Sequence, residues 1–269
     1  TIIIPADTPA DKMPTVTVVP ADDDVFEKPE NFSATISNPE NAELGTPTAN
    51  GVFKDEATGD YPKVNLSANP AEATEGETTG VVFHIDQTGA TEHESTVTFK
   101  LDKGDLEDAD VQSITYTDTA GVAHTVTLAE ALAGITISIP ADTPADKMPT
   151  VTVVPADDDV FEKPENFSAT ISNPENAELG TPTANGVFKD EATGDYPKVN
   201  LSANPAEATE GETTGVVFHI DQTGATEHES TVTFKLDKGD LEDSDIQSIT
   251  YTDTAGVAHT VTLAEALAG

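Results

Sequence analysis

The sequence has no cysteine, no tryptophan and no arginine, and it is poor in positive charge. Without cysteine the chain has neither a disulfide framework nor a thiolate metal site, so its stability must have another source. Its 12 basic residues, all lysine, stand against 50 acidic ones, which gives a formal net charge of −38. Because phosphate backbones and anionic lipids are held by basic side chains, this balance excludes binding to nucleic acids and to anionic membranes.

Long apolar runs are also missing. No run approaches the roughly 20 residues of a membrane-spanning helix, and residues 1–5 are too short and lack the basic flank of a signal peptide. We therefore expect an internal segment of a longer protein with no direct membrane contact. Hydrophobic residues make up 36% of the chain and aromatic residues 5%, which predicts a folded protein with a thin core.

The chain is built from two nearly identical copies of one repeat. Residues 1–134 align with 136–269 at an offset of 135, and the copies differ only at Ile3/Ser138, Ala109/Ser244 and Val111/Ile246. Two identical active sites in tandem would be unusual for an enzyme. Near-identity is typical of arrays in which each repeat mainly contacts its neighbours.

Apolar residues within a repeat alternate with polar ones, which is typical of strands with one buried face. Nine segments show this pattern or are short apolar runs bounded by turn residues, namely 64–67, 81–86, 96–101, 113–117, 124–128, 135–139, 151–154, 167–171 and 187–189. Only residues 128–134 predict a helical turn, closed by glycine. We predict an all-β fold: tandem immunoglobulin-like antiparallel sandwiches of about nine strands and one helical turn each.

The repeat period fixes the length of a domain but not its limits. Residues 54–62 are acidic and contain glycine and proline, as linkers do, whereas the 134/135 seam has no such character. We therefore predict a complete repeat at 57–191, with its core at 62–190. Residues 1–56 are then the C-terminal half of one repeat, and 192–269 the N-terminal half of another. We further expect residues 198–269 of one molecule to dock on 1–54 of another, head to tail.

Carboxylates are concentrated in short loops. The sharpest cluster is the aspartate triplet with a following glutamate, present twice as Asp22, Asp23, Asp24 and Glu27 and as Asp157, Asp158, Asp159 and Glu162. A like-charged pair at 4 Å costs about 4 kcal/mol at an effective dielectric of 20. A hard divalent cation removes that cost, and Ca²⁺, which takes six to eight oxygens in flexible geometry, suits such loops.

Further acidic groups complete two predicted classes of calcium site. Sites within a domain would add loop acids near its ends, namely Glu75, Glu77, Asp190 and Glu191, with the copies Glu210 and Glu212. Sites at the junctions would use Asp55, Glu56 and Asp60, or Asp190, Glu191 and Asp195, and would lock neighbouring domains. Another acidic segment, 102–110, is interpreted as a solvated loop, because charge runs usually serve solubility.

The motif from Asp157 to Phe167, DDDxxExxExF, resembles the Calx-β motif, and Glu75–Glu77 and Asp190–Glu191 match the calcium-loop positions of that family. The similarity spans most of 62–191, although residues 86–91 replace the Gly-rich loop of the family and its aspartate. Near-identical acidic repeats without cysteine or tryptophan also resemble the extender repeats of giant RTX adhesins. That resemblance implies a non-catalytic bacterial cell-surface tether, exported by type I secretion, stiffened by several Ca²⁺ ions per repeat and carrying a distal ligand-binding tip.

Three other interpretations stay open at this point. His84, His93, His124 and Ser95 offer catalytic side chains, but no nucleophile motif or metal-binding histidine pair accompanies them. A carbohydrate- or ice-binding module is the stronger rival, although aromatic residues are few and no long threonine array is present. A halophilic surface domain would use its acidity for hydration alone, and metal titration would distinguish it.

Overall fold

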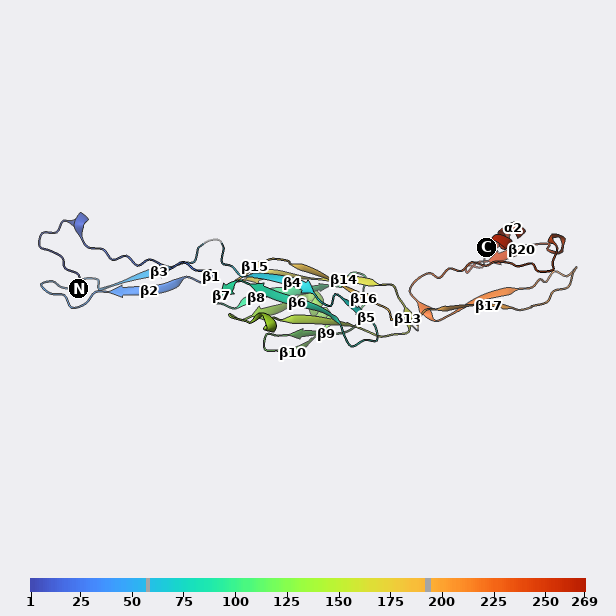
Figure 1. Ribbon diagram of the computed structural model, residues 1–269, viewed down its shortest axis with the longest axis horizontal. Coiled ribbons are helices and arrows are strands. Elements are labelled where there is room, and N and C mark those ends of the chain that lie inside the picture. The colour runs from blue at the N-terminus through green and yellow to red at the C-terminus, as the bar shows by residue number, and fades with distance from the viewer. Residues whose placement is uncertain (57–58, 192–194) are drawn as a thin grey trace. The chain divides into compact units, whose positions relative to one another are not determined.

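The computed structural model describes residues 1–56, 59–191 and 195–269, and it divides into two compact units. The first unit comprises residues 1–158 and 163–191, and the second comprises 159–162 and 192–269. The first unit contains a β-sandwich, the central sandwich, formed by residues 63–189 (Figure 1). Among the described residues, no helix is long and apolar enough to cross a membrane.

The central sandwich consists of a six-stranded and a five-stranded sheet. In spatial order, the six-stranded sheet contains β10 (Ala123–Val126), β9 (Val111–Thr117), β12 (Thr150–Pro155), β6 (Val81–Thr88), β4 (Lys63–Ala68) and β15 (Glu178–Leu179). The five-stranded sheet contains β11 (Ile135–Ile139), β8 (Ser95–Asp102), β14 (Glu165–Glu175), β16 (Thr183–Lys189) and β5 (Glu72–Thr74). All neighbours are antiparallel except the short pairs β15–β4 and β16–β5, which are parallel.

Strict alternation of side chains builds the core between these sheets. Along β6, every second residue from Val81 to Ile85 is fully buried, and β8 and β12 repeat the pattern. Four phenylalanines occupy the centre, where Phe83 packs edge-on against Phe99 and Phe167, and Phe167 contacts Phe188. Alternation with period two therefore turns the apolar residues of both sheets towards each other.

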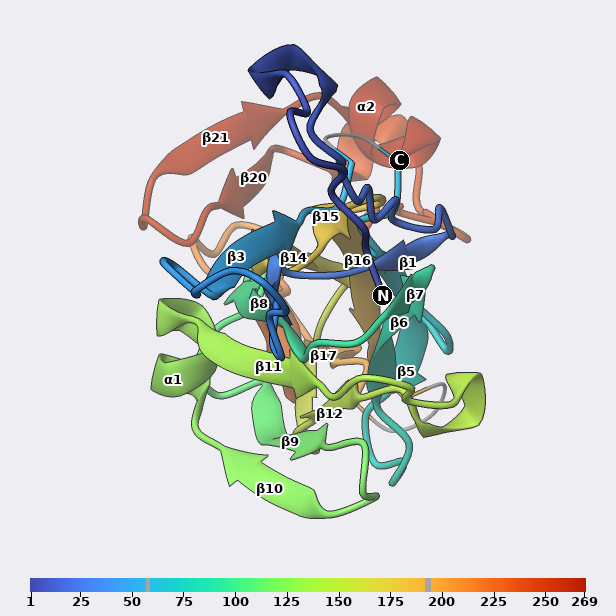
Figure 2. The ribbon, with the colours of Figure 1, turned by 90° about the vertical axis from the view of Figure 1, so that its left-hand side faces the viewer.

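Helix α1 (Leu128–Ala133) bridges the two sheets along one edge, between β10 and β11 (Figure 2). Its start is fixed by a capping box: the Glu130 amide donates to Thr127 Oγ1 over 3.2 Å, and the Thr127 amide donates to Glu130 Oε2 over 2.8 Å. Gly134 ends the helix with a positive φ of 110°. A non-glycine residue would be strained there, so the chain can turn directly into β11.

The chain joins the sandwich at opposite ends of β6. Pro62, just before β4, lies 3.1 Å from the Cβ position of Gly89, which follows the end of β6. At the other end, the Glu75 amide donates to the Lys189 carbonyl over 2.9 Å, and Glu75 belongs to the loop before β6. We call these the N-terminal pole and the C-terminal pole. Eight residues of strand separate them by roughly 25 Å.

We call residues 1–56 and 195–269 the flanks of the central sandwich. Their strands form short ladders. Residues 1–56 contain the 3₁₀ turn η1 (Ala10–Lys12) and strands β1 (Val25–Phe26), β2 (Glu30–Thr35) and β3 (Thr48–Phe53). In the first unit, β1 pairs with β7 (Ala90–Thr91), and η2 (Ala145–Lys147) precedes β12. The second unit contains β13 (Val160–Phe161), β17 (Lys198–Ala203), β18 (Phe218–Thr223), β19 (Ala225–Thr226), η3 (Asp243–Asp245), β20 (Ile249–Thr252), β21 (Ala258–Val261) and α2 (Leu263–Ala268).

The all-β sandwich with one short helical turn per repeat is confirmed. The sandwich has eleven strands rather than the expected nine, because β5 and β15 were not predicted. Both pair in parallel at the sheet edges over two or three residues, too short for an alternation pattern. The division into a half, a complete repeat and a half stays a prediction, and its limits adjoin residues 57–58 and 192–194, which lie outside the described residues.

Candidate metal centre

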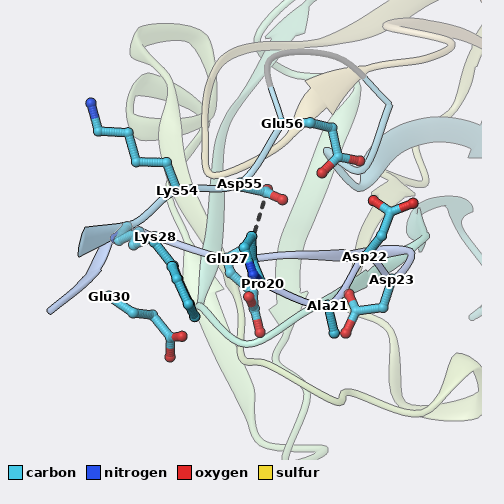
Figure 3. A pocket seen from close by; sticks show the side chains of 11 residues that line it. Pro20, Ala21, Asp22, Asp23, Glu27, Lys28, Glu30, Lys54, Asp55 and Glu56 are labelled. Carbon is cyan, nitrogen blue, oxygen red and sulfur yellow. Dashed lines mark hydrogen bonds between the residues drawn. The ribbon is translucent and has the colours of Figure 1, made fainter. Parts of the chain in front are cut away.

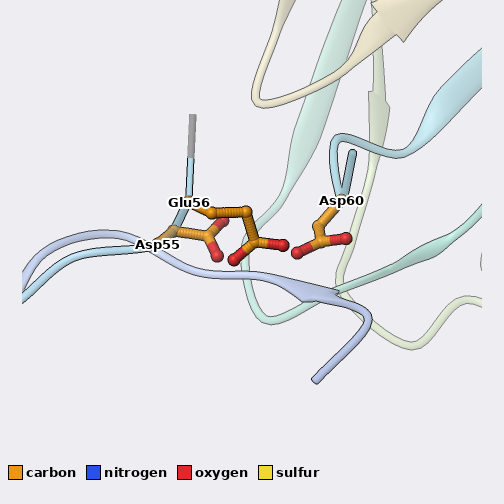
Figure 4. Close-up of side chains that lie close together, drawn as sticks. All are labelled: Asp55, Glu56 and Asp60. Atoms are coloured by element: carbon orange, nitrogen blue, oxygen red, sulfur yellow. The ribbon is translucent and has the colours of Figure 1, made fainter. Parts of the chain in front are cut away.

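Three carboxylates meet at the N-terminal pole, in the segment between β3 and β4. One oxygen from each of Asp55, Glu56 and Asp60 lies within 4.8 Å of the other two (Figure 4). A hydrogen bond with Asp60 raises the pKa of the Glu56 carboxyl above its ordinary value. Asp60 Oδ2 is buried and has no hydrogen-bond partner. The chain thus concentrates negative charge here and leaves a buried acceptor unsatisfied.

The first aspartate triplet lies beside this segment. A cavity between the loop 20–30 and residues 53–56 is lined by Asp22, Asp23, Glu27, Asp55 and Glu56, among others (Figure 3). The Glu27 amide donates to Asp55 Oδ2 over 3.2 Å, and the Val25 amide donates to Asp23 Oδ1 over 2.9 Å. Desolvation, reinforced by the charge of Glu30, raises the pKa of the Glu27 carboxyl. The structure therefore brings together acids that the sequence separates by about 30 positions.

A second carboxylate triad forms at the C-terminal pole. Oxygens of Glu75, Asp190 and Glu191 lie within 4.8 Å of one another, and Glu75 is only 4% exposed. The parallel pairing of β5 with β16 places Thr74 opposite Lys189, so the two loops that follow run side by side. Glu191 Oε2 is buried and has no hydrogen-bond partner. This end of the sandwich repeats the chemistry of the N-terminal pole.

Asp157 approaches the same loop. A Cβ at Gly76 would lie 2.9 Å from Asp157 Oδ1, and Gly76 has a positive φ of 70°. Glycine is needed here on both counts, because a larger residue would be strained and would displace the carboxylate. The turn Glu75-Gly76-Glu77 thus lets an aspartate of the second triplet come close to the triad at the C-terminal pole.

Other predicted ligands are not gathered into these triads. Glu77 is exposed and accepts a hydrogen bond from Thr79 Oγ1 over 3.3 Å, and Asp24 is exposed. Asp158, Glu210 and Glu212 are exposed as well. Asp159, Glu162 and Asp195 belong to the second unit, where β13, which lies between Asp159 and Glu162, pairs with β19. Calcium binding by the predicted residues stays a prediction.

One buried carboxylate pair does not follow from the sequence pattern. Asp110 was assigned to a solvated loop, but it is only 7% exposed, and its carboxylate accepts from the Glu107 amide. One of its oxygens lies within 4.8 Å of an oxygen of Glu165, at the start of β14. The assignment of Asp110 was wrong because the backbone turn 107–110 folds its side chain inward. The only available signal was the spacing of acids in 105–110.

Three of the four side chains considered for catalysis make structural hydrogen bonds. His84 Nε2 lies 2.9 Å from the Asn69 carbonyl, and His124 Nε2 lies 2.8 Å from Asp118 Oδ2. Ser95 Oγ donates to the Asn176 carbonyl over 3.1 Å. These contacts fix turns and strand ends of the sandwich, and the three residues lie on different strands rather than in one constellation.

Comparison with known proteins gives one family. The model of the Calx-beta domain matches residues 7–56 and 59–192, which together exceed half of the chain. No curated protein matches the chain. Among solved structures, the apo-form Calx CBD1 domain is similar at 18% identity and a TM-score of 0.33, over 49% of this chain and 98% of that one.

A second similar structure is CBD12 from CALX1.2, at 18% identity and a TM-score of 0.33. The match covers 47% of this chain and 44% of that structure. The family assignment therefore rests on the domain model and not on these structures. The chain belongs to the Calx-beta domain family.

Proposed function

We propose that this chain is a non-catalytic calcium-binding module whose two poles are fastened by Ca²⁺, and that it serves as an extender repeat of a bacterial surface adhesin. One observation carries the proposal: carboxylate triads lie at both ends of the central sandwich, and each contains a buried oxygen without a hydrogen-bond partner, Asp60 Oδ2 or Glu191 Oε2. A buried unsatisfied acceptor is costly unless a ligand satisfies it.

The donor set fits calcium. Both triads offer only carboxylate oxygens, and they come from loops rather than from a rigid octahedral frame. Ca²⁺ accepts six to eight oxygens at variable angles, whereas Mg²⁺ demands strict geometry and keeps its waters. The chain would hold the ion with Asp55, Glu56 and Asp60 at one pole and with Glu75, Asp190 and Glu191 at the other.

The positions of the triads support a mechanical role. Each one lies where the central sandwich meets the next segment of the chain, so an ion there would restrain the joint between repeats. Two near-identical copies of one repeat are typical of repeat arrays, and an array of such domains can serve as a long spacer. We therefore assign the module to a calcium-rich, extracellular location on the bacterial cell surface, after type I secretion, with neighbouring repeats as its partners and a distal tip as the ligand-binding part.

Calorimetric titration of the 269-residue chain with CaCl₂ tests the binding. We expect stoichiometric binding, weakened by Asp60→Asn and by Glu191→Gln, each through the loss of one triad. The matched control is Asp142→Asn, which changes one exposed acid outside the triads by the same charge. Diffuse binding that responds equally to all three substitutions would contradict the proposal and favour an acidic surface that serves hydration.

Small-angle scattering tests the mechanical part separately. We expect the maximum dimension to be sharply defined in CaCl₂ and broadly distributed in EDTA, because the joints lose their ions. Asp142→Asn should behave as the unmodified chain does. An unchanged distance distribution in EDTA would refute the role as a rigid spacer even if calorimetry shows binding. A hit on a glycan array would instead favour the carbohydrate-binding alternative.

A further inference from the structure

A two-residue strand follows each aspartate triplet and pairs with a later part of the chain. Strand β1, after the first triplet, pairs in parallel with β7, so that Val25 lies opposite Ala90 and Phe26 opposite Thr91. Strand β13, after the second triplet, pairs with β19 in the same register. In the described parts of the chain, these four strands form only these two ladders. The two residues after a triplet thus pair with the copy of the repeat that follows.

An aromatic site receives the side chain of Phe26. The ring is only 6% exposed, stacks on Tyr61 with centroids 4.2 Å apart, and meets the His93 ring edge-on at 6.4 Å. Thr91, which lies opposite Phe26 in the ladder, is 3% exposed. Burying a phenylalanine ring between aromatic side chains is favourable both through the apolar area removed from water and through the ring geometry.

The backbone beside β7 is also shaped to receive this segment. The Glu92 amide donates to the Phe26 carbonyl over 3.3 Å. Thr91 Oγ1 accepts from the His93 amide over 3.1 Å and donates to the His93 carbonyl over 3.3 Å, which holds the turn after β7. The turn therefore presents both a backbone donor and the edge of an aromatic ring to the incoming strand.

The second copy of the repeat forms the same contacts inside the second unit. Phe161 stacks on Tyr196 with centroids 4.1 Å apart. The Glu227 amide donates to the Phe161 carbonyl over 3.4 Å, and Thr226 Oγ1 donates to the same carbonyl over 3.2 Å. The arrangement is therefore a property of the repeat and recurs with its period.

Charge attraction does not hold the segment in place. Glu27 directly follows Phe26, and desolvation together with the charges of Glu30 and Glu92 raises the pKa of its carboxyl. Acidic side chains on the two partners therefore repel each other. The buried ring and the backbone hydrogen bonds must supply the attraction, and neither of them requires a cation.

We propose that β7, Tyr61 and His93 form an acceptor site for the valine–phenylalanine segment of the preceding repeat, and that this site joins neighbouring repeats without calcium. Phe26 is the residue by which the site recognises the segment. Because the ladder is parallel and its register is fixed, a preceding repeat can join in one direction only. Each repeat carries one such segment and one acceptor site, so the contact can recur along an array. This inference goes beyond the calcium binding proposed above and does not rest on it.

Cross-linking of an introduced cysteine pair tests the docking, since the chain has no cysteine of its own. Val25→Cys with Ala90→Cys places two thiols on residues that are opposite each other in the ladder. A short bifunctional thiol reagent is added in EDTA, and digestion with mass spectrometry gives the rate at which the pair is joined. The full 269-residue chain is used throughout.

The control pair is Val25→Cys with Glu77→Cys. Its two residues are separated by a similar length of chain, but Glu77 is exposed and belongs to the loop at the C-terminal pole, roughly 25 Å from the N-terminal pole. We expect the ladder pair to react at least about tenfold faster than this control, because docking raises the effective concentration of one thiol near the other. Equal rates for the two pairs would overturn the acceptor site.

Substitution of the ring tests what the site recognises. Phe26→Ala, added to the ladder pair, should slow the reaction several-fold. The matched control is Phe32→Ala, which removes a ring of the same flank that packs on Phe53 in the β2–β3 ladder, and it should leave the rate unchanged. Circular dichroism shows whether the central sandwich stays folded in both variants. An unchanged rate in Phe26→Ala would overturn the role of the ring and with it the proposal.

Repeating the reaction in CaCl₂ separates this proposal from calcium binding. A ladder pair that reacts faster than its control in EDTA supports the acceptor site, even if calorimetry detects no bound calcium. A ladder pair that exceeds its control only after CaCl₂ is added would overturn docking without calcium and would leave the calcium proposal standing. The two proposals can therefore fail independently.

Discussion

The ring of Phe26 stacks on the ring of Tyr61, with centroids 4.2 Å apart and planes inclined by 29°. Phe26 lies in β1, which pairs with β7 of the same unit, and Tyr61 follows the triad residue Asp60. The second unit contains the equivalent stack of Phe161 on Tyr196, at 4.1 Å. The stack thus fastens residues 25–26 to the chain at the N-terminal pole, next to the carboxylate triad.

We expect Tyr61→Ala to loosen this joint, since an aromatic pair contributes about 0.5–1.5 kcal/mol beyond the area that it buries. Cleavage after Glu56 by a glutamate-specific protease, followed by mass spectrometry, measures the effect. The rate should rise several-fold in Tyr61→Ala. Tyr61→Phe keeps the stacked ring and should match the unmodified chain, and equal rates for all three proteins would show that the stack does not restrain the joint.

The effect of Glu75→Gln on the thermal stability of the chain should differ in sign with and without calcium. In EDTA, the substitution removes one of three like charges crowded at the C-terminal pole and should leave the midpoint of thermal unfolding unchanged or raise it. In CaCl₂ it removes a ligand. An ion held at 100 times its dissociation constant stabilises the fold by about 2.7 kcal/mol, so the variant should lose up to that amount.

Thermal unfolding of the variant in both buffers, followed by circular dichroism, checks this sign change. Glu77→Gln is the matched control, because Glu77 lies two residues away and is exposed outside the triad. A loss of stability in EDTA as large as that in CaCl₂ would show that the role of Glu75 is structural and independent of the ion.

The sequence predicts the sandwich because the alternation of apolar and polar residues shows which face of each strand is buried. Val81, Phe83 and Ile85 alternate with half-exposed neighbours, and the same alternation marks β8 and β12. The short strands β5 and β15 carry no such signal, because two or three residues cannot show a period and their pairing is set by strands more than 100 positions away.

The candidate site was only partly predictable for a related reason. The spacing of acids suggested that Asp55, Glu56 and Asp60 belong together, since they are neighbours in sequence. The sequence also groups Glu75 with Asp190 and Glu191 as loop acids of one domain, but it does not reveal the parallel β5–β16 pair that brings them together. Asp110 shows the limit most clearly: its burial follows from a local backbone turn, and its charge pattern is indistinguishable from that of a solvated loop.

Asp105 should give the protein part of its acid sensitivity. Its Oδ2 accepts hydrogen bonds from the side chain and the backbone amide of Asn166, both at 3.1 Å, and these bonds lower the pKa of Asp105 below its ordinary value of 3.8. A carboxyl whose pKa is lowered by folding stabilises the protein above its ordinary pKa and loses that contribution as the pH falls through the lowered value.

Unfolding midpoints measured between pH 6 and pH 3 check this dependence. The unfolding midpoint should fall less steeply with decreasing pH in Asp105→Ala than in the unmodified chain. Asp240→Ala removes the copy of the same residue from the flank 198–269 and is the matched control, which should keep the original slope in dilute protein. If the midpoints of Asp105→Ala and Asp240→Ala fell equally steeply with decreasing pH, the bonds to Asn166 would contribute nothing to the pH dependence.

Phe83 and Phe218 occupy the same position of the repeat, but Phe83 is buried and Phe218 is exposed. Comparing the two substitutions separates the effect of packing from the effect of composition. Phe83→Ala opens a cavity beside Phe99 and Phe167 and should cost about 3–5 kcal/mol of unfolding free energy. Phe218→Ala removes the same ring from an exposed face and should change the stability of dilute protein by less than about 0.5 kcal/mol. Chemical unfolding monitored by circular dichroism gives both values.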